Sequence, residues 1–276
     1  MAGAIQAELA AAGLSDAVEA DRQGPAVTFH CRDSLGRRVA VKVIDSDFGQ
    51  EGCERFLRDG PALATISAHP NIADVLRVGV TAGNRPFIVM PCYARGSLAQ
   101  RVREAGPIPW REASRIGIEL CGALDGGHRA GALHGDIKPA NVFVDDDGEP
   151  RLVDFGMARI AGGDKTPLFF GSIAYTAPEV LAGNPPTVAA DVYSVGVTLH
   201  ELLAGKSPYE RLADEDLVSQ YTRIASAPVP DLRPDGIPPD VYTAIETAMA
   251  KDPSDRYASM RDFGHDLQTA VSRVAT

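Results

Sequence analysis

The sequence contains no long apolar run, no paired cysteines and no excess of positive charge. No run approaches the roughly 18 apolar residues of a membrane-spanning helix, and residues 1–12 lack the basic segment of a secretory signal peptide. The four cysteines are scattered without a CxxC pair, which argues against a zinc site or disulfide framework and favours reduced thiols in the cytoplasm. A net charge of −10 gives no indication of a nucleic-acid-binding surface.

The length and composition are those of a globular protein. The chain has 276 residues, of which 45% are hydrophobic and 23% are charged. This size fits one large domain or two lobes with a substantial core, and neither an internal repeat nor a low-complexity tract interrupts it.

Two short motifs bring together the groups that phosphoryl transfer needs. Residues 134–141 read His-Gly-Asp-Ile-Lys-Pro-Ala-Asn and offer a carboxylate (Asp136), a cation (Lys138) and an amide (Asn141). Thirteen positions after that asparagine comes Asp154, followed by a phenylalanine and a glycine. One group aligns the acceptor hydroxyl, one neutralises the γ-phosphate and two hold Mg²⁺.

These motifs resemble the catalytic loop and DFG motif of protein kinases, although the family's usual arginine after the histidine is Gly135 here. Further matching motifs follow in the family's order: Gly171–Glu179 ending in Ala-Pro-Glu, Asp191–Gly196, and Ala250–Tyr257. The stretches VMPCYARGSL, HGDIKPAN and DFGMARIAGG are similar to the kinase domains of bacterial kinase–ATPase regulatory fusions. The resemblance covers about residues 20–270, and its specificity comes from the order and spacing of several motifs.

The resemblance implies an α+β fold with two lobes. Residues 1–92 would form a small β-rich ATP-binding lobe with one helix, in which 1–20 are an extension, and residues 93–276 a larger, mainly helical catalytic and substrate lobe. The cofactors would be ATP and Mg²⁺, and the partner a protein substrate, with no nucleic acid and no membrane span. A homodimer or a regulatory partner is left open.

The resemblance also assigns roles to the residues of the two motifs. Asp136 would orient the substrate hydroxyl and accept its proton, and Lys138 would stabilise the transferring phosphoryl group. Asn141 and Asp154 would bind Mg²⁺, and Ser172 would bridge the catalytic aspartate and lysine.

The nucleotide-binding residues are expected mainly in the first lobe. Lys42 lies in a β run, and by itself it reads as a solvent-facing residue on an edge strand. The resemblance makes it the lysine that contacts the α- and β-phosphates. Met90 would be the gatekeeper, the N–H of Cys92 would meet adenine, and Phe143 lies on a strand that would pack beneath adenine.

The first lobe departs from the family pattern at two places. The expected glycine-rich loop falls near residues 21–26, where only Gly24 is present and Pro25 lacks an N–H for a phosphate. The acidic partner of Lys42 falls at Asp59, inside an expected helix over 49–68, but Gly60 and Pro61 follow at once. The helix is therefore expected to split, with Asp59 either pairing with Lys42 or capping the second piece, and Glu54 is the alternative partner.

The periodicity predicts the remaining elements. Residues 1–20 read as a short helix and a loop, 97–105 and 110–131 as helices, and 26–33, 38–44, 72–80 and 86–92 as strands. In the second helix four apolar residues are expected in the core: Ile116, Leu120, Ala123 and Leu124.

Four further contacts are expected in the second lobe. His134 is expected to pack on Phe155 as a core histidine, and Asp145–Gly148 to form a turn between two strands. The resemblance also implies that Asp191 holds the catalytic loop and that Arg256 pairs with Glu179.

Two functions from different classes remain open. The first is an active protein Ser/Thr kinase, for which Lys42, Asp136 and Asp154 are all present. The second is a pseudokinase scaffold, which the missing glycines and Gly135 favour. A small-molecule phosphotransferase is disfavoured by Ser172 and the Ala-Pro-Glu segment. Because Gly135 removes the usual receptor for an activation-loop phosphate, activity is expected not to depend on phosphorylation of Thr166.

Overall fold

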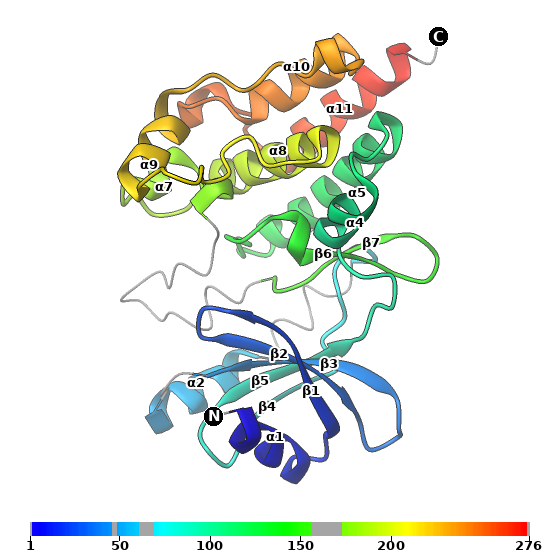
Figure 1. The fold of residues 1–276 in the computed structure, drawn as a ribbon, viewed down its shortest axis with the longest axis vertical. Coiled ribbons are helices and arrows are strands. Elements are labelled where there is room, and N and C mark those ends of the chain that lie inside the picture. Colours follow the sequence, from blue (N-terminus) through cyan, green and yellow to red (C-terminus); the bar gives the residue numbers. More distant parts are fainter. Residues whose placement is uncertain (1, 46–48, 61–68, 156–172, 275–276) are drawn as a thin grey trace. The chain divides into compact units, whose positions relative to one another are not determined.

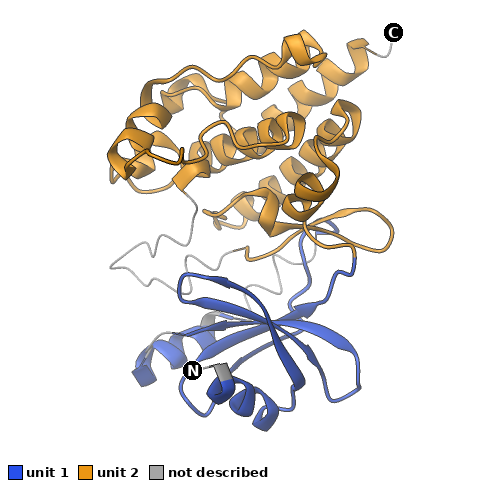
Figure 2. Ribbon diagram, viewed as in Figure 1, with its two compact units in different colours: residues 1–94, 157–170 blue, residues 95–156, 171–276 orange. Residues whose placement is uncertain are grey.

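The computed structural model describes residues 2–45, 49–60, 69–155 and 173–274 (Figure 1). They fall into two compact units, one containing residues up to Ala94 and one that begins at Arg95 (Figure 2). The predicted assignment of the ATP-binding and catalytic lobes to residues 1–92 and 93–276 stays a prediction. None of the described helices combines the length and apolarity needed to cross a membrane.

The first unit is built on an antiparallel sheet in the order β1-β2-β3-β5-β4. Its strands are β1 (Ser15–Gln23), β2 (Ala26–Arg32), β3 (Arg38–Ile44), β4 (Arg77–Val80) and β5 (Pro86–Pro91). Residues of β3 alternate between two faces, so Val41 is fully buried and Lys42 is half-buried on the opposite face. Because β3 is the central strand, the edge-strand interpretation of Lys42 is wrong.

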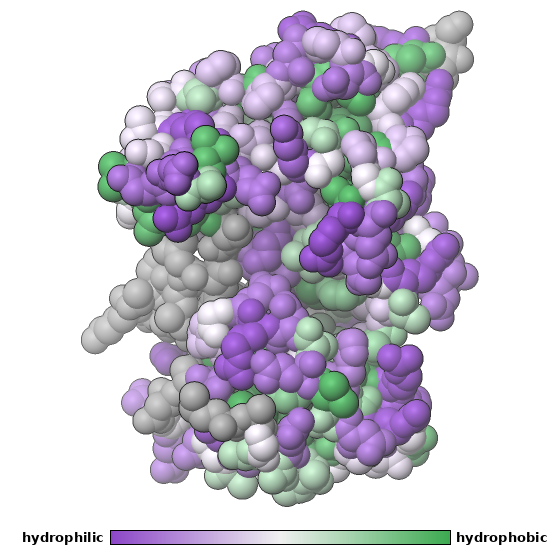
Figure 3. All heavy atoms as spheres, in the orientation of Figure 1, coloured by the Kyte–Doolittle hydropathy of each residue, from purple (hydrophilic) through white to green (hydrophobic). Residues whose placement is uncertain are grey.

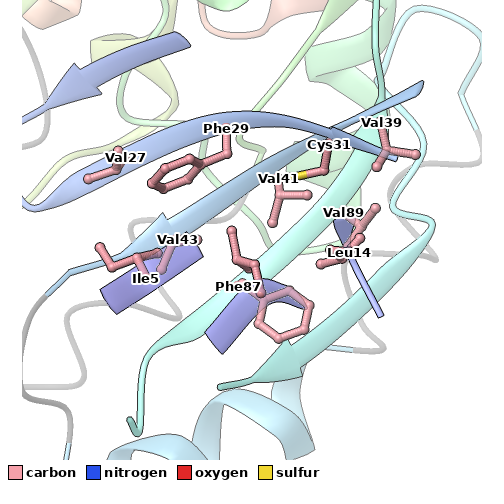
Figure 4. Packing of buried hydrophobic residues seen from close by; sticks show 11 residues of the cluster. Ile5, Leu14, Val27, Phe29, Cys31, Val39, Val41, Val43, Phe87 and Val89 are labelled. Carbon is pink, nitrogen blue, oxygen red and sulfur yellow. The ribbon is translucent and has the colours of Figure 1, made fainter. Parts of the chain in front are cut away.

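One face of this sheet is covered by α1 (Ala2–Ala11). Ile5 and Leu9 from the helix and Leu14 after it are at most 1% exposed. They pack in one cluster with side chains from the sheet, including Phe29 and Phe87 (Figure 4). The helix therefore supplies part of the core of the first unit.

Two predicted elements have different bounds in the structure. The predicted loop up to residue 20 is wrong because β1 begins at Ser15; its side chains are mostly exposed, so the strand is held by backbone pairing with β2 and carries no apolar pattern. The predicted strand 72–80 begins only at Arg77, although Ile72 is buried. Burial of residues outside regular structure explains this second error.

The second unit is mainly helical. Its α-helices are α4 (Leu98–Ala105), α5 (Trp110–Arg129), α7 (Pro178–Leu181), α8 (Val188–Ala204), α9 (Leu217–Ser226), α10 (Pro239–Ala248) and α11 (Met260–Val274). Helix α5 lies against α8 and α11, and the four predicted core residues of α5 are at most 2% exposed. Figure 3 shows mainly hydrophilic side chains on the visible face.

In sequence order, a two-stranded sheet follows α5 and precedes the later helices of this unit. Its strands are β6 (Val142–Val144) and β7 (Pro150–Leu152), and the predicted turn between them is confirmed. Asp145 caps this turn, since its Oδ1 accepts from the N–H groups of Asp147 and Glu149 at 3.0 and 2.9 Å. Its Oδ2 accepts from Arg151 at 2.8 Å, so this carboxylate has a structural role.

Candidate active site

The loop between α5 and β6 is anchored by a carboxylate from α8. Asp191 is 2% exposed, and its Oδ2 and Oδ1 accept from the N–H groups of His134 and Gly135, both at 2.9 Å. Gly135 has φ +78°, a conformation that suits glycine. The prediction that Asp191 holds this loop is confirmed.

Two histidines support this anchor. The His134 ring is buried, its Nε2 lies 2.9 Å from the carbonyl oxygen of Val153, and it meets the Phe155 ring edge-on at 5.3 Å. The core role predicted for His134 is confirmed. Sequence reasoning missed His128, whose Nε2 lies 2.7 Å from Asp191 Oδ2. Its place in the last turn of α5, six residues before His134, was the available signal.

The loop brings three of the predicted functional side chains together. Lys138 Nζ lies 3.0 Å from Asp136 Oδ2, and Asn141 Nδ2 donates to the same oxygen at 2.9 Å and to the Asp136 carbonyl at 2.8 Å. Burial raises the pKa of the Asp136 carboxyl, and the Lys138 ammonium opposes that shift. A carboxylate in this setting is a stronger base than an exposed one.

In the DFG segment, the Phe155 ring packs closely on α5. Asp154 has φ +66°, and the Phe155 ring that follows is buried. A Cβ on Gly127 of α5 would lie 2.0 Å from Phe155 Cζ, so only glycine leaves room for this ring. Gly127 thereby fixes the position of the Phe155 ring, next to Asp154 in the chain.

This contact predicts opposite effects for two adjacent glycines of α5. Gly127→Ala is expected to lower the free energy of unfolding by about 1–3 kcal/mol, because the Phe155 ring must move. Gly126→Ala meets nothing within 4 Å and is expected to raise it by about 0.5–1 kcal/mol, since alanine favours the helix. Urea unfolding of both variants checks the pair, and equal shifts would contradict the seating role of Gly127.

In the first unit, Lys42 and Met90 lie on one face of the sheet. Ala40 pairs with Met90 and Lys42 with Ile88 across β3 and β5. The residues between them, such as Val41, belong to the cluster on the α1 face. Since side chains alternate along a strand, Lys42 and Met90 point away from α1.

Two other residues that were predicted to contact the nucleotide lie on a strand or directly after one. Cys92 follows β5 directly and is partly exposed. Phe143 lies on β6 of the second unit, half-buried, and forms an isolated β-bridge with Ser97. Their contacts with a nucleotide stay predictions.

The segment where a glycine-rich loop was expected is a tight turn. Gln23 pairs with Ala26, so only Gly24 and Pro25 connect β1 to β2. Gly24 has φ +57°, as the first residue of such a turn often requires. Between these two residues the turn offers one backbone N–H, because proline has none.

Several predicted features lie outside the described residues: Ser172, Thr166, the side chain of Asp59, and the expected second helical piece after Pro61. Helix α2 (Gly49–Asp59) ends where the Gly-Pro pair predicted a break. Glu54 is exposed and accepts from Gln50 at 3.0 Å. The choice between Asp59 and Glu54 as the partner of Lys42 stays a prediction.

The donor set fits a hard divalent cation. With Nδ2 of Asn141 donating to Asp136, the amide oxygen is the atom that this side chain offers to a metal. Asp154 adds a carboxylate, and Mg²⁺ prefers carboxylate and carbonyl oxygens. Both residues therefore suit Mg²⁺ by chemistry, and their assignment as ligands stays a prediction.

Comparison with known proteins agrees with this geometry. The protein kinase domain family model matches residues 24–267. The serine/threonine-protein kinase PknK of Mycobacterium tuberculosis and that of Mycobacterium bovis are 50% identical over 272 residues, which is 98% of this chain. PknL of Mycobacterium tuberculosis is 34% identical over 87% of this chain and 61% of its own length.

The matched PknK proteins are longer, and this chain covers 24% of their length. A crystal structure of Rad53 with AMP-PNP has the same fold, with a TM-score of 0.76 and 22% identity over 92% of this chain and 64% of that chain. The predicted α+β kinase fold and the resemblance to bacterial Ser/Thr kinases are both confirmed. The chain therefore belongs to the protein kinase domain family.

Proposed function

We propose that this chain transfers the γ-phosphate of ATP to serine or threonine hydroxyls of a protein substrate. The observation that carries the proposal is the cluster in which Lys138 and Asn141 each lie within 3.0 Å of the Asp136 carboxylate, on a loop that Asp191 anchors. The relatives named Ser/Thr kinases support the same substrate class.

Each group of the cluster has a task in this reaction. Asp136 aligns the acceptor hydroxyl and takes its proton, helped by the burial that raises its pKa. Lys138, beside it, stabilises charge on the group being transferred. Asn141 and Asp154 would hold Mg²⁺, which neutralises phosphate charge when bound. Lys42 would contact the α- and β-phosphates, with Met90, Cys92 and Phe143 around adenine and Ser172 near the reacting groups.

Location and control belong to the proposal as well. The scattered cysteines favour a cytoplasmic protein. Gly135 in place of arginine favours activity that does not depend on a phosphate at Thr166. A homodimer or a regulatory partner is left open.

A second candidate is a pseudokinase scaffold. It is favoured by the two-residue turn at Gly24–Pro25, which offers few backbone donors to a phosphate. The transfer chemistry lies on the other unit, where the Asp136 cluster is complete, so the kinase remains the first proposal.

Metal removal tests the proposal directly. The protein, radiolabelled ATP and Mg²⁺ are incubated with a general Ser/Thr acceptor such as myelin basic protein, with and without excess EDTA. We expect label on serine or threonine in the presence of Mg²⁺. EDTA should reduce this label to background, because phosphoryl transfer needs the metal. If folded protein gives no label with Mg²⁺ or Mn²⁺, the scaffold is favoured, and label on tyrosine alone would contradict the substrate class.

A further inference from the structure

Helix α1 lies outside residues 24–267, the range matched to the kinase family, yet it is built into the sheet that carries Lys42. Its buried side chains, Ile5 and Leu9, belong to the cluster on the sheet face opposite Lys42, and Figure 4 shows Ile5 among the side chains of that cluster. A polar residue of the same helix, Glu8, is directed to the turn between β4 and β5.

Glu8 is bound by two partners at that turn. Its Oε2 accepts from Thr81 Oγ1 at 2.6 Å, and its Oε1 accepts from Arg85 at 2.7 Å. Thr81 is 4% exposed, and the Glu8 side chain is 19% exposed. A Cβ on Gly83 would lie 2.4 Å from Glu8 Oε1, so this glycine leaves space for the carboxylate.

From Arg85 the contacts continue to the hairpin of β1 and β2. Arg85 Nε donates to Asp45 Oδ1 at 3.0 Å, and the N–H of Asp45 donates to the carbonyl of Pro25 at 2.7 Å. A second cation, Arg22 near the end of β1, lies 3.5 Å from Asp45 Oδ2. The hydrogen bond from Arg85 is the largest cause of the lowered pKa of Asp45.

We propose that Glu8, Arg85 and Asp45 form a relay by which α1 positions the Gly24–Pro25 turn for nucleotide binding. The three are positioning residues, since they act through the turn. The inference rests on the proposed function and on this turn occupying the place where the glycine-rich loop was expected. A turn with one backbone donor depends strongly on being held in place, because mobility would take away that donor.

A purely structural role for α1 makes a different prediction. If α1 only covered the sheet, its apolar residues would matter and Glu8 would not. Glu8→Ala separates the two cases because it leaves Ile5 and Leu9 in place and favours the helix. Asp74→Ala is the control, since Asp74 is an exposed carboxylate of the same unit.

The first measurement is backbone hydrogen exchange of the nucleotide-free protein. Glu8→Ala is expected to speed exchange at residues 22–27 and at Asp45 by about tenfold, as loss of a charged hydrogen bond implies. Exchange in the centres of β3 and β5 and in the Asp74→Ala control should stay unchanged. Unchanged exchange at residues 22–27, or an equal rise throughout the sheet, would overturn the relay.

The second measurement is the Kd of ADP·Mg²⁺ by calorimetry. Glu8→Ala and Asp45→Ala are each expected to raise it about three- to tenfold, and the double variant no further, because both remove one relay. Full additivity or unchanged Kd values would contradict the relay. If the wild-type protein binds no nucleotide, the proposed function fails, whereas the exchange experiment still decides whether α1 holds the turn.

Discussion

Replacing Asp136 with asparagine is expected to lower kcat for phosphoryl transfer by about 10²–10⁴-fold, with a much smaller change in KM for ATP. Asparagine has nearly the shape of aspartate, and its amide oxygen can still accept from Lys138, which lies 3.0 Å from the carboxylate. It has no basic oxygen to take the hydroxyl proton. The side chain therefore stays in place while its chemistry is lost.

Steady-state kinetics on a protein acceptor measures this effect, and urea unfolding shows whether the variant is folded. Asp147→Asn is the control, because Asp147 is an exposed carboxylate in the turn between β6 and β7 and is expected to keep full activity. If Asp136→Asn raised KM while kcat stayed the same, Asp136 would be a binding residue and the assigned role would be wrong.

Replacing Arg256 with methionine is expected to lower the free energy of unfolding by about 3–5 kcal/mol. The Arg256 side chain has no exposed surface, and its two terminal nitrogens donate to the two Glu179 oxygens at 2.7 and 2.8 Å. Three carbonyl groups accept from the same guanidinium, namely those of Ala189, Ala250 and Lys251. Methionine leaves a carboxylate and several carbonyls without this donor.

Urea denaturation of Arg256→Met measures the loss. Arg261→Met is the matched control, since that side chain is 77% exposed and its nearest carboxylate is 4.0 Å away; a change of less than about 0.5 kcal/mol is expected there. A double variant, Arg256→Met with Glu179→Gln, should recover part of the loss because the unpaired charge is gone. Equal losses for the two arginines would contradict the buried-pair explanation.

The second unit was predicted well because its motifs carry their own chemistry. The roles of Asp191 and of the Arg256–Glu179 pair were implied by the resemblance to kinase motifs, and His134 belongs to one of those motifs; each makes the expected contact. Polar residues at fixed distances in a sequence are informative when each needs a buried partner. His128 was missed because a histidine at the end of a helix has many ordinary explanations.

The first unit was predicted less well because its contacts are long-range and its signals weak. Strand β1 exposes most of its side chains, so no alternation indicated a strand. Glu8 is separated by more than 70 positions from the two residues that bind it, and no motif links them. Local propensity indicates the helix near the N-terminus and the strand that carries Lys42, but not the contacts that join α1 to the sheet.

The backbone of Gly135 decides what an arginine at this position would cost. At φ +78° a residue with a side chain costs about 1–2 kcal/mol, and both N–H groups that bind Asp191 must keep their places. Gly135→Arg would introduce that strain whether or not a phosphate were present to bind the new side chain. A phosphate-dependent control site placed elsewhere on the protein would avoid this cost.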